Sequence, residues 1–265
     1  MRPTAEPAVS PVAGDRLRGL VRLNLAVGLL HLAQAVAILL VAEAATLPVG
    51  VTYLTGPPGA GEYGGPASLF DLRVDLAIAA FLLLAAVDHL GVISQPARGW
   101  YAANVARGIN PARWWEYSIS ASLMIVLIAM LSGIKEGTAL LALFGVNAAT
   151  ILFGLAMERA NEGPGPVDWR PFVYGCLAGA VPWLAIGLQL AVAQGEGDGV
   201  PGFVVAIFVS LFVLFNGFAV TMWLQYRGRG RWADPVRAER AYLVLSLVAK
   251  SVLAWQVYAG ALAGG

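Results

Sequence analysis

The stretch LVLSLVAKSVL, residues 243–253, places one lysine, Lys250, in the middle of an apolar run. The run extends from Val236 to Leu262, which is longer than the roughly 20 mostly apolar residues that a helix needs to cross a bilayer. An ionisable side chain so deep in a membrane is costly and usually faces the interior of a helix bundle, beside a partner. The stretch therefore predicts a membrane-spanning helix with a lysine that needs a buried counter-charge or a chemical role.

The composition of the whole chain agrees with a membrane protein. Of its 265 residues, 58% are hydrophobic and only 12% are charged, and the mean hydropathy is +0.72, which is too apolar for a soluble domain with a charged surface. The net charge of +1 gives no reason to expect a nucleic-acid partner. A single cysteine, Cys176, excludes an internal disulfide and a cysteine-rich metal site.

Seven stretches of the chain are long and apolar enough to span a bilayer. We therefore predict an all-α membrane protein, a single seven-helix transmembrane domain over residues 1–265. The predicted helices run approximately over Leu20–Ala42, Val74–Ile93, Trp114–Leu131, Thr138–Met157, Phe172–Ala193, Phe203–Tyr226 and Val236–Leu262. Between the first two, the β-prone Val51–Leu54 stretch is followed by Gly- and Pro-rich turns, so a short β-hairpin is expected in that connection.

The distribution of Lys and Arg residues predicts how the bundle is oriented. Fourteen of the seventeen fall on one side of the predicted helices, only Arg73 and Lys135 fall on the other, and Lys250 lies inside the membrane. Cytoplasmic loops carry the excess of positive residues. We therefore expect a multi-pass protein of the cell membrane with a cytoplasmic N-terminus and an extracellular C-terminus.

Glu116 is the carboxylate that we expect beside Lys250. It lies near the start of the third segment, in the run RWWEYSISAS of residues 113–122, and Ser120 and Met124 continue its helical face. The third and seventh segments run in the same direction, and helical side chains tilt towards their own N-terminus, so Lys250 reaches back towards Glu116. Arg113, three residues earlier, is placed to hold or steer the Glu116 carboxylate.

Two interpretations of this lysine differ in their chemistry. In the first, Lys250 and Glu116 form a structural ion pair and nothing more. In the second, the desolvated amine condenses with an aldehyde to form a Schiff base. The spacing of the residues leaves both open.

The combination of these features resembles a known family. A lysine in the middle of the seventh helix and a carboxylate on the third resemble microbial rhodopsins, and the RWWEYS run together with the inverted orientation resembles heliorhodopsins, over Leu17 to Ala261. The resemblance implies a rhodopsin-like bundle with all-trans retinal attached to Lys250 as a protonated Schiff base and Glu116 as its counterion. It also places Ser246 where ion-pumping relatives usually carry a second carboxylate.

Polar residues of the first two segments are expected on the cytoplasmic side, where Glu116 lies. His31 follows Asn24 by seven residues, and His89 follows Asp88. A lone buried histidine is more often a packing residue, but two near a carboxylate suggest proton exchange, because histidine titrates near neutral pH. The resemblance implies that such histidines line a hydrated cavity near the Schiff base. The predicted proton network consists of His31, His89, Arg113, Asp88, Glu158 and Glu239, and no metal site is predicted.

The remaining candidate residues form an apolar pocket that the resemblance suggests for the chromophore. Asn147 is expected to line the chromophore or a water, or else to make an ordinary hydrogen bond between helices. Each apolar member is equally compatible with ordinary bundle core. The predicted cofactor-binding set is Lys250, Glu116, Ser246, Ser120, Met124, Asn147, Thr150, Ile151, Phe215 and Met222.

The arrangement of charges predicts a light-sensing receptor, and not an enzyme or an efficient ion pump. A pump needs proton acceptors and donors on both sides of the Schiff base. The extracellular halves of the first three segments, including Ala35–Val41, Leu76–Leu84 and Leu123–Leu131, offer no charge in those stretches, and Leu127 stands where the third helix would offer a second acid. Alternatives are a light-driven or light-gated ion transporter, and a bundle in which Lys250 and Glu116 are only a structural pair. The expected partners are membrane lipid, a second copy in a homodimer by the resemblance, and a cytoplasmic signalling protein at the basic surface.

Overall fold

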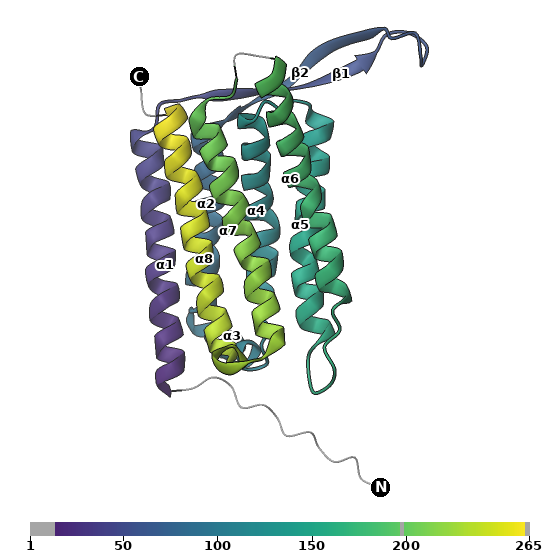
Figure 1. The fold of residues 1–265 in the computed structure, drawn as a ribbon. Helices are drawn as coiled ribbons and strands as arrows, with labels where there is room; N and C mark the ends of the chain where they lie inside the picture. Colours follow the sequence, from purple (N-terminus) through teal and green to yellow (C-terminus); the bar gives the residue numbers. More distant parts are fainter. Residues whose placement is uncertain (1–13, 197–198, 263–265) are drawn as a thin grey trace.

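The computed structural model describes residues 14–196 and 199–262. Seven of its helices are long and apolar enough to cross a membrane, and they stand side by side in one bundle (Figure 1). The spanning helices are α1 (Gly14–Val41), α2 (Val74–Val92), α4 (Pro111–Leu131), α5 (Gly137–Ala160), α6 (Arg170–Glu196), α7 (Gly202–Arg227) and α8 (Pro235–Val257), which continues into the π-helical turn η2 (Tyr258–Leu262). The predicted class, an all-α membrane protein with seven spans, is confirmed.

The two ends of the bundle differ in what they carry. At one end lie the short helix α3 (Gln95–Ala106) and the 3-10 turn η1 (Gly230–Ala233), and α1 begins there (Figure 1). At the other end lies a two-stranded sheet, and α8 ends there. We call these the α3 end and the hairpin end.

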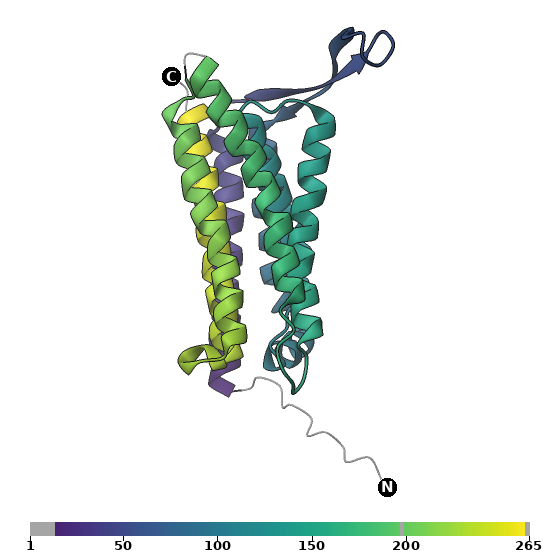
Figure 2. The same ribbon diagram turned by 45° about the vertical axis from the view of Figure 1, so that its right-hand side comes forward.

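The hairpin predicted between the first two spans is present, and it is longer than expected. Strands β1 (Thr46–Leu54) and β2 (Tyr63–Arg73) pair antiparallel with two register irregularities, and the sheet projects beyond the helices (Figure 2). Its root is bound to the turn between α4 and α5, because the Gly50 N–H donates to the Lys135 carbonyl at 3.1 Å and the Thr52 N–H donates to the Glu136 carboxylate at 3.0 Å. Just before β1, the Glu43 N–H donates to the Leu262 carbonyl at 3.1 Å.

Helix α3 was not expected, and several helix ends differ from the prediction. A helix that crosses a bilayer needs roughly 20 apolar residues, and α3 has only 12. Its start carries two ordinary helix signals, Ser94 as the N-cap residue and Pro96 in the first turn. Helix α1 begins at Gly14, six residues before the predicted start at Leu20. The prediction was based on apolar residues alone, whereas a helix can continue with polar residues where it leaves the hydrocarbon region of the bilayer.

The core runs along the middle of the bundle, around α4. This helix is the most buried of the seven spans, and it packs against α2 and α5. Towards the hairpin end, its Ile128 joins Ile78 and Phe81 of α2 and Leu253 of α8 in one cluster of completely buried apolar side chains. The buried polar residues of α4 lie in its other half, from Arg113 to Ser122, so α4 brings an apolar half and a polar half into the same core.

Candidate functional site

Lys250 lies in the interior of the bundle, on the face of α8 that also buries Ser246 and Leu253. Only 3% of the lysine is exposed. Its Nζ donates to the Ser246 hydroxyl at 3.1 Å, one helical turn earlier. The ammonium also lies over the ring of Tyr117 from α4, 4.8 Å from the ring centroid, a distance at which a cation and an aromatic face attract each other.

Glu116 is the counter-charge of this lysine. Lys250 Nζ is 3.3 Å from Glu116 Oε1 and 3.4 Å from Oε2, and both side chains are buried. The local sequence fixes the carboxylate's depth, because Asn110 caps α4 by accepting from the Arg113 N–H and Pro111 stands in the first turn. Glu116 therefore sits in the second turn of α4, where the side chain of Lys250 reaches back towards the α3 end.

Arg113 does not hold Glu116, contrary to the expectation from their spacing. Its guanidinium lies between two other carboxylates: Nη2 donates to Glu158 of α5, and Nη1 donates to Glu239 of α8. Arg113 and Glu116 are neighbours on the surface of α4, but each pairs with an opposite charge from another helix: Arg113 with Glu158 and Glu239, and Glu116 with Lys250. Glu158 and Glu239, both members of the predicted proton network, are buried, at 0% and 4% exposure.

Asn110 and Tyr101 complete the set of donors around these carboxylates. The Asn110 backbone N–H donates to Glu158 at 2.8 Å, and its side-chain amide donates to Glu239 at 2.9 Å. The Tyr101 hydroxyl, on α3, donates to Glu239 at 3.0 Å. Burial, reinforced by the nearby Glu239 charge, raises the pKa of Tyr101 far above its usual range, so this phenol keeps its proton and serves as a donor.

A chain of hydrogen bonds leads from Glu239 to the histidines. The side-chain amide nitrogen of Asn24, on α1, donates to the Tyr101 hydroxyl oxygen at 3.0 Å. The side-chain oxygen Oδ1 of Asn24 accepts a hydrogen bond from His89 Nδ1 at 3.1 Å. His31 stacks on His89 with ring centroids 5.7 Å apart and ring planes 7° from parallel. Hydrogen bonds thus join His89 to Glu239 through Asn24 and Tyr101, two residues that were not predicted to take part. His31 touches this network by stacking on His89.

The remaining network candidate, Asp88, lies at the margin of this set. Its Oδ2 is 4.0 Å from His89 Nδ1, and its side chain is 12% exposed. Among the described residues, both ring nitrogens of His31 and Nε2 of His89 lack a hydrogen-bond partner. Buried polar groups without a protein partner are usually satisfied by ordered water. This part of the core is therefore suited to hold water.

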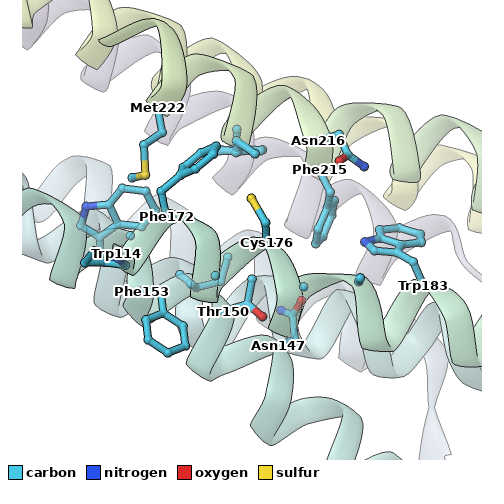
Figure 3. A pocket seen from close by; sticks show the side chains of 18 of the residues that line it. Trp114, Asn147, Thr150, Phe153, Phe172, Cys176, Trp183, Phe215, Asn216 and Met222 are labelled. Carbon is cyan, nitrogen blue, oxygen red and sulfur yellow. The ribbon is translucent and has the colours of Figure 1, made fainter. Parts of the chain in front are cut away.

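A cavity of about 300 Å³ lies between α5, α6 and α7, beside the start of α4. This volume is at the lower limit of small-molecule pockets, roughly 300–1,000 Å³. Figure 3 shows Trp114, Phe172 and Met222 at one end of the cavity and Trp183 and Phe215 at the other. Phe212, one of its wall residues, is 43% exposed, so the cavity reaches the side of the bundle.

Aromatic rings connect this cavity to Lys250. Phe218 of α7 lines the cavity and packs edge-to-face on Tyr117, with ring centroids 5.4 Å apart. Tyr117 is the ring over which the Lys250 ammonium lies. Lys250 itself does not line the cavity, so Tyr117 and Phe218 form the boundary between the ion pair and the cavity.

Most of the residues proposed for the pocket line this cavity. They are Asn147, Thr150, Ile151, Phe215 and Met222. Asn147 also donates to the Ser122 hydroxyl of α4 at 3.1 Å. Met124 lies elsewhere, in the main apolar core, and Ser120 is completely buried one turn after Glu116, with no hydrogen-bond partner for its hydroxyl among the described residues.

Comparison with known proteins identifies the family. The family model described as Heliorhodopsin matches residues 20–262. The chain belongs to the heliorhodopsin family. A heliorhodopsin is a rhodopsin, so membership implies a retinal chromophore and a photoreceptor type of protein, in agreement with the seven spans and the buried lysine.

Among solved structures, the heliorhodopsin fold seen here is similar to the crystal structure of a light-driven proton pump, LR (Mac), from Leptosphaeria maculans. The two share 15% sequence identity with a TM-score of 0.65, over 94% of this chain and 95% of that one. At this identity the similarity shows a common fold and carries no statement about pumping. No curated protein sequence matches the chain.

Several residues of this heliorhodopsin site were missed from the sequence. The aromatic wall of the cavity includes Trp183 and Phe212, and the spacing of Phe208, Phe212 and Phe215 along one helical face was a usable signal for it. Tyr101 gives no such signal, because the 12 residues of α3 are too few to be recognised as a membrane span.

Proposed function

We propose that the chain is a light-sensing receptor that carries all-trans retinal on Lys250 and transports no ions efficiently. The observation that supports this proposal most directly is the buried pair of Lys250 and Glu116, separated by 3.3 Å and divided by two aromatic rings from an elongated, aromatic-walled cavity. A structural ion pair needs no such cavity. A covalently held apolar ligand does.

The residues present fit such a ligand at both of its ends. The amine of Lys250 is enclosed and desolvated, the condition under which a lysine forms a bond with an aldehyde. The cavity walls are mostly aromatic and aliphatic, with Asn147, Thr150 and Asn216 among the polar members. When bound, retinal supplies visible absorption and light-driven isomerisation.

Glu116 has the position of a counterion. A carboxylate this close to the lysine nitrogen stabilises a positive charge there. Ser246 accepts a hydrogen bond from the same nitrogen and offers no charge, so Glu116 is the carboxylate in direct contact with Lys250 among the described residues.

The route for a proton leads from the lysine nitrogen towards the α3 end. His31 and His89 are buried there, and their unpartnered nitrogens suit a small group of waters. The hydrogen bonds through Asn24 and Tyr101 continue from His89 to Glu239. We propose that these groups accept the proton released near Glu116 and return it.

The buried side chains between Lys250 and the hairpin end are apolar, which favours a protein that does not pump ions. Beyond Lys250, the buried side chains of α8 are Leu253, Ala254 and Val257, and Leu127 of α4 packs into the same apolar cluster. A charge in the centre of a membrane costs at least about 2.5–3.5 kcal/mol. The buried carboxylate at the hairpin end, Asp75, is already bound by Arg73 at 3.1 Å.

The chromophore assignment is tested by expressing the protein with all-trans retinal and recording a visible spectrum. We expect a visible band, and borohydride reduction followed by peptide mapping should leave the adduct on Lys250. Lys250→Ala should lose the band. A band that persists in Lys250→Ala without added amine would favour the interpretation in which the lysine and Glu116 are only a structural pair.

The absence of efficient transport is tested by whole-cell recording under continuous light. We expect at most a brief transient current, because charge moves only locally between the lysine nitrogen and the α3 end. A second measurement follows the pH of a weakly buffered cell suspension during illumination. A steady photocurrent across clamp voltages would establish the alternative, a light-driven or light-gated ion transporter.

We further propose a cytoplasmic N-terminus, an extracellular C-terminus, a homodimer and a cytoplasmic signalling partner. The orientation is supported by the arginines at the α3 end. The exposed hairpin side chains Tyr63 and Phe70, at 67% and 55%, are compatible with contact to a second copy. Crosslinking in native membranes, in the dark and under illumination, tests for the second copy of the chain and for the cytoplasmic signalling protein.

A further inference from the structure

A second pocket lies at the α3 end of the bundle, where α6 begins and α7 ends. Its volume is about 610 Å³. Its aromatic and basic lining residues are Trp169, Phe172, Trp223, Tyr226, Arg227 and Arg229. We call it the interface pocket. Two guanidinium groups among aromatic rings are the side chains that bind an anionic group at a membrane surface.

The local backbone brings both arginines to this pocket. Gly228 ends α7 in the left-handed conformation, with φ of 60°, and its N–H bonds back to the carbonyls of Leu224 and Gln225. This turn, which favours glycine, places Arg227 and Arg229 on either side of it. Arg227 stacks on the Trp223 ring, with its guanidinium carbon 4.7 Å from the ring centroid, so its charge is held at the pocket wall.

Neither arginine is neutralised within residues 14–196 and 199–262. The nearby acids are bound to other cations: Glu162 to Arg107 and Arg159, and Asp234 to Arg16. Asp168 accepts from Arg170 at 2.7 Å, and this contact lowers the pKa of Asp168 to about 2. Arg227 and Arg229 therefore face the interface pocket with two positive charges and no internal partner.

The interface pocket borders an exposed apolar face of α6. Val173 lines the pocket, and Leu177 and Val181 follow it at steps of four residues along one face of the helix. These three side chains are 49%, 67% and 48% exposed. A ligand with a charged head at Arg227 and Arg229 can therefore lay an apolar chain along this face of α6, outside the cavity proposed for retinal.

We propose that the interface pocket binds an anionic phospholipid, with its phosphate between Arg227 and Arg229 and one acyl chain along the exposed face of α6 that carries Val173 and Leu177. The charge complementarity selects an anionic headgroup. The pairing of aromatic rings with arginines matches the depth of lipid headgroups, and the exposed apolar face of α6 accommodates the chain. Because the chain lies outside the cavity proposed for retinal, the proposal holds whether or not retinal is bound.

The test measures lipid binding by native mass spectrometry of the delipidated full-length protein. We expect phosphatidylglycerol to bind more tightly than phosphatidylcholine, and the double variant Arg227→Gln, Arg229→Gln to lose roughly 25-fold in affinity for phosphatidylglycerol, about fivefold for each charge. The variant Arg227→Lys, Arg229→Lys, which keeps both charges, should retain most of the preference.

The matched control removes two charges from the same end but outside the pocket. Arg231→Gln, Arg237→Gln serves this purpose, because Arg237 also stacks on a tryptophan, Trp232, at 5.5 Å. The control should bind phosphatidylglycerol within about twofold of the unchanged protein. Equal losses in both double variants, or equal binding of phosphatidylcholine, would overturn the proposal. Competition by inorganic phosphate at the same concentration as the lipid would show a site for free anions and would overturn it as well.

Discussion

The backbone of Gly154 on α5 lies directly against the indole ring of Trp114 on α4. A Cβ at position 154 would overlap ring carbon Cζ3, lying closer than any real Cβ contact. The ring has little freedom to move, because it packs edge-to-face on Tyr242 at 5.7 Å and lies under the Arg113 guanidinium. Both Gly154 and Trp114 line the cavity between α5, α6 and α7, so this contact sets the shape of one of its ends.

Gly154→Ala is therefore expected to destabilise the protein by about 1–3 kcal/mol and to reduce the yield of retinal-bound protein. The matched control is Gly145→Ala on the same helix, where an added Cβ meets no atom within 4 Å and a gain of up to about 1 kcal/mol is expected. Thermal denaturation and the visible band report the two effects. An unchanged band and melting temperature in Gly154→Ala would show that Trp114 moves aside freely.

Glu116→Gln should shift the pH at which the visible band is lost to a lower value. The carboxylate is 3.3 Å from the Lys250 nitrogen, and its removal leaves a positive charge there without a neutralising partner. A pH titration of the spectrum measures the shift. Asp88→Asn is the comparison, and a larger effect there would mean that Asp88, and not Glu116, is the main counterion.

Glu239→Gln should cost about 3 kcal/mol or more of stability. Glu239 accepts from Arg113, Asn110 and Tyr101, and loss of one partner of a buried ion pair typically costs about 3–5 kcal/mol. Glu162→Gln breaks pairs that are partly exposed, so a loss of less than about 1 kcal/mol is expected there. Thermal or denaturant unfolding in detergent distinguishes the two, and equal losses would contradict a special role for the buried cluster.

A tag after Gly265 should react with a membrane-impermeant label in intact cells. The reason is the excess of arginine at the α3 end, which predicts that this end is cytoplasmic and that α8 ends on the opposite side. A tag in the loop between α5 and α6, at the α3 end, serves as the control and should react only after lysis. The reverse pattern of labelling would overturn the orientation.

The sequence predicted the fold and the central ion pair because both depend on local or periodic signals. Seven apolar runs define seven spans, and the depths of Lys250 and Glu116 along parallel helices place them together. The partners of Arg113 could not be predicted in this way, since Glu158 and Glu239 are 45 and 126 residues away and only the packing of α4 between its neighbours brings them to it. Tyr101 was missed because a 12-residue helix outside the membrane gives no signal in a search for spans.

The root of the hairpin turns one end of the bundle into a pivot. Its hydrogen bonds join the connection from α1 to α2, the turn between α4 and α5 and the last turn after α8. Towards the α3 end the ties between α4, α5 and α8 are side-chain contacts, the ion pairs of Arg113 with Glu158 and Glu239, which can rearrange without breaking backbone hydrogen bonds. A span of 20 residues is roughly 30 Å long, so a tilt of about 5° would move its free end by roughly 2–3 Å. If the hairpin end stays fixed, a displacement at Lys250, half-way along its span, is roughly doubled at the α3 end, where Glu239 of the same helix lies.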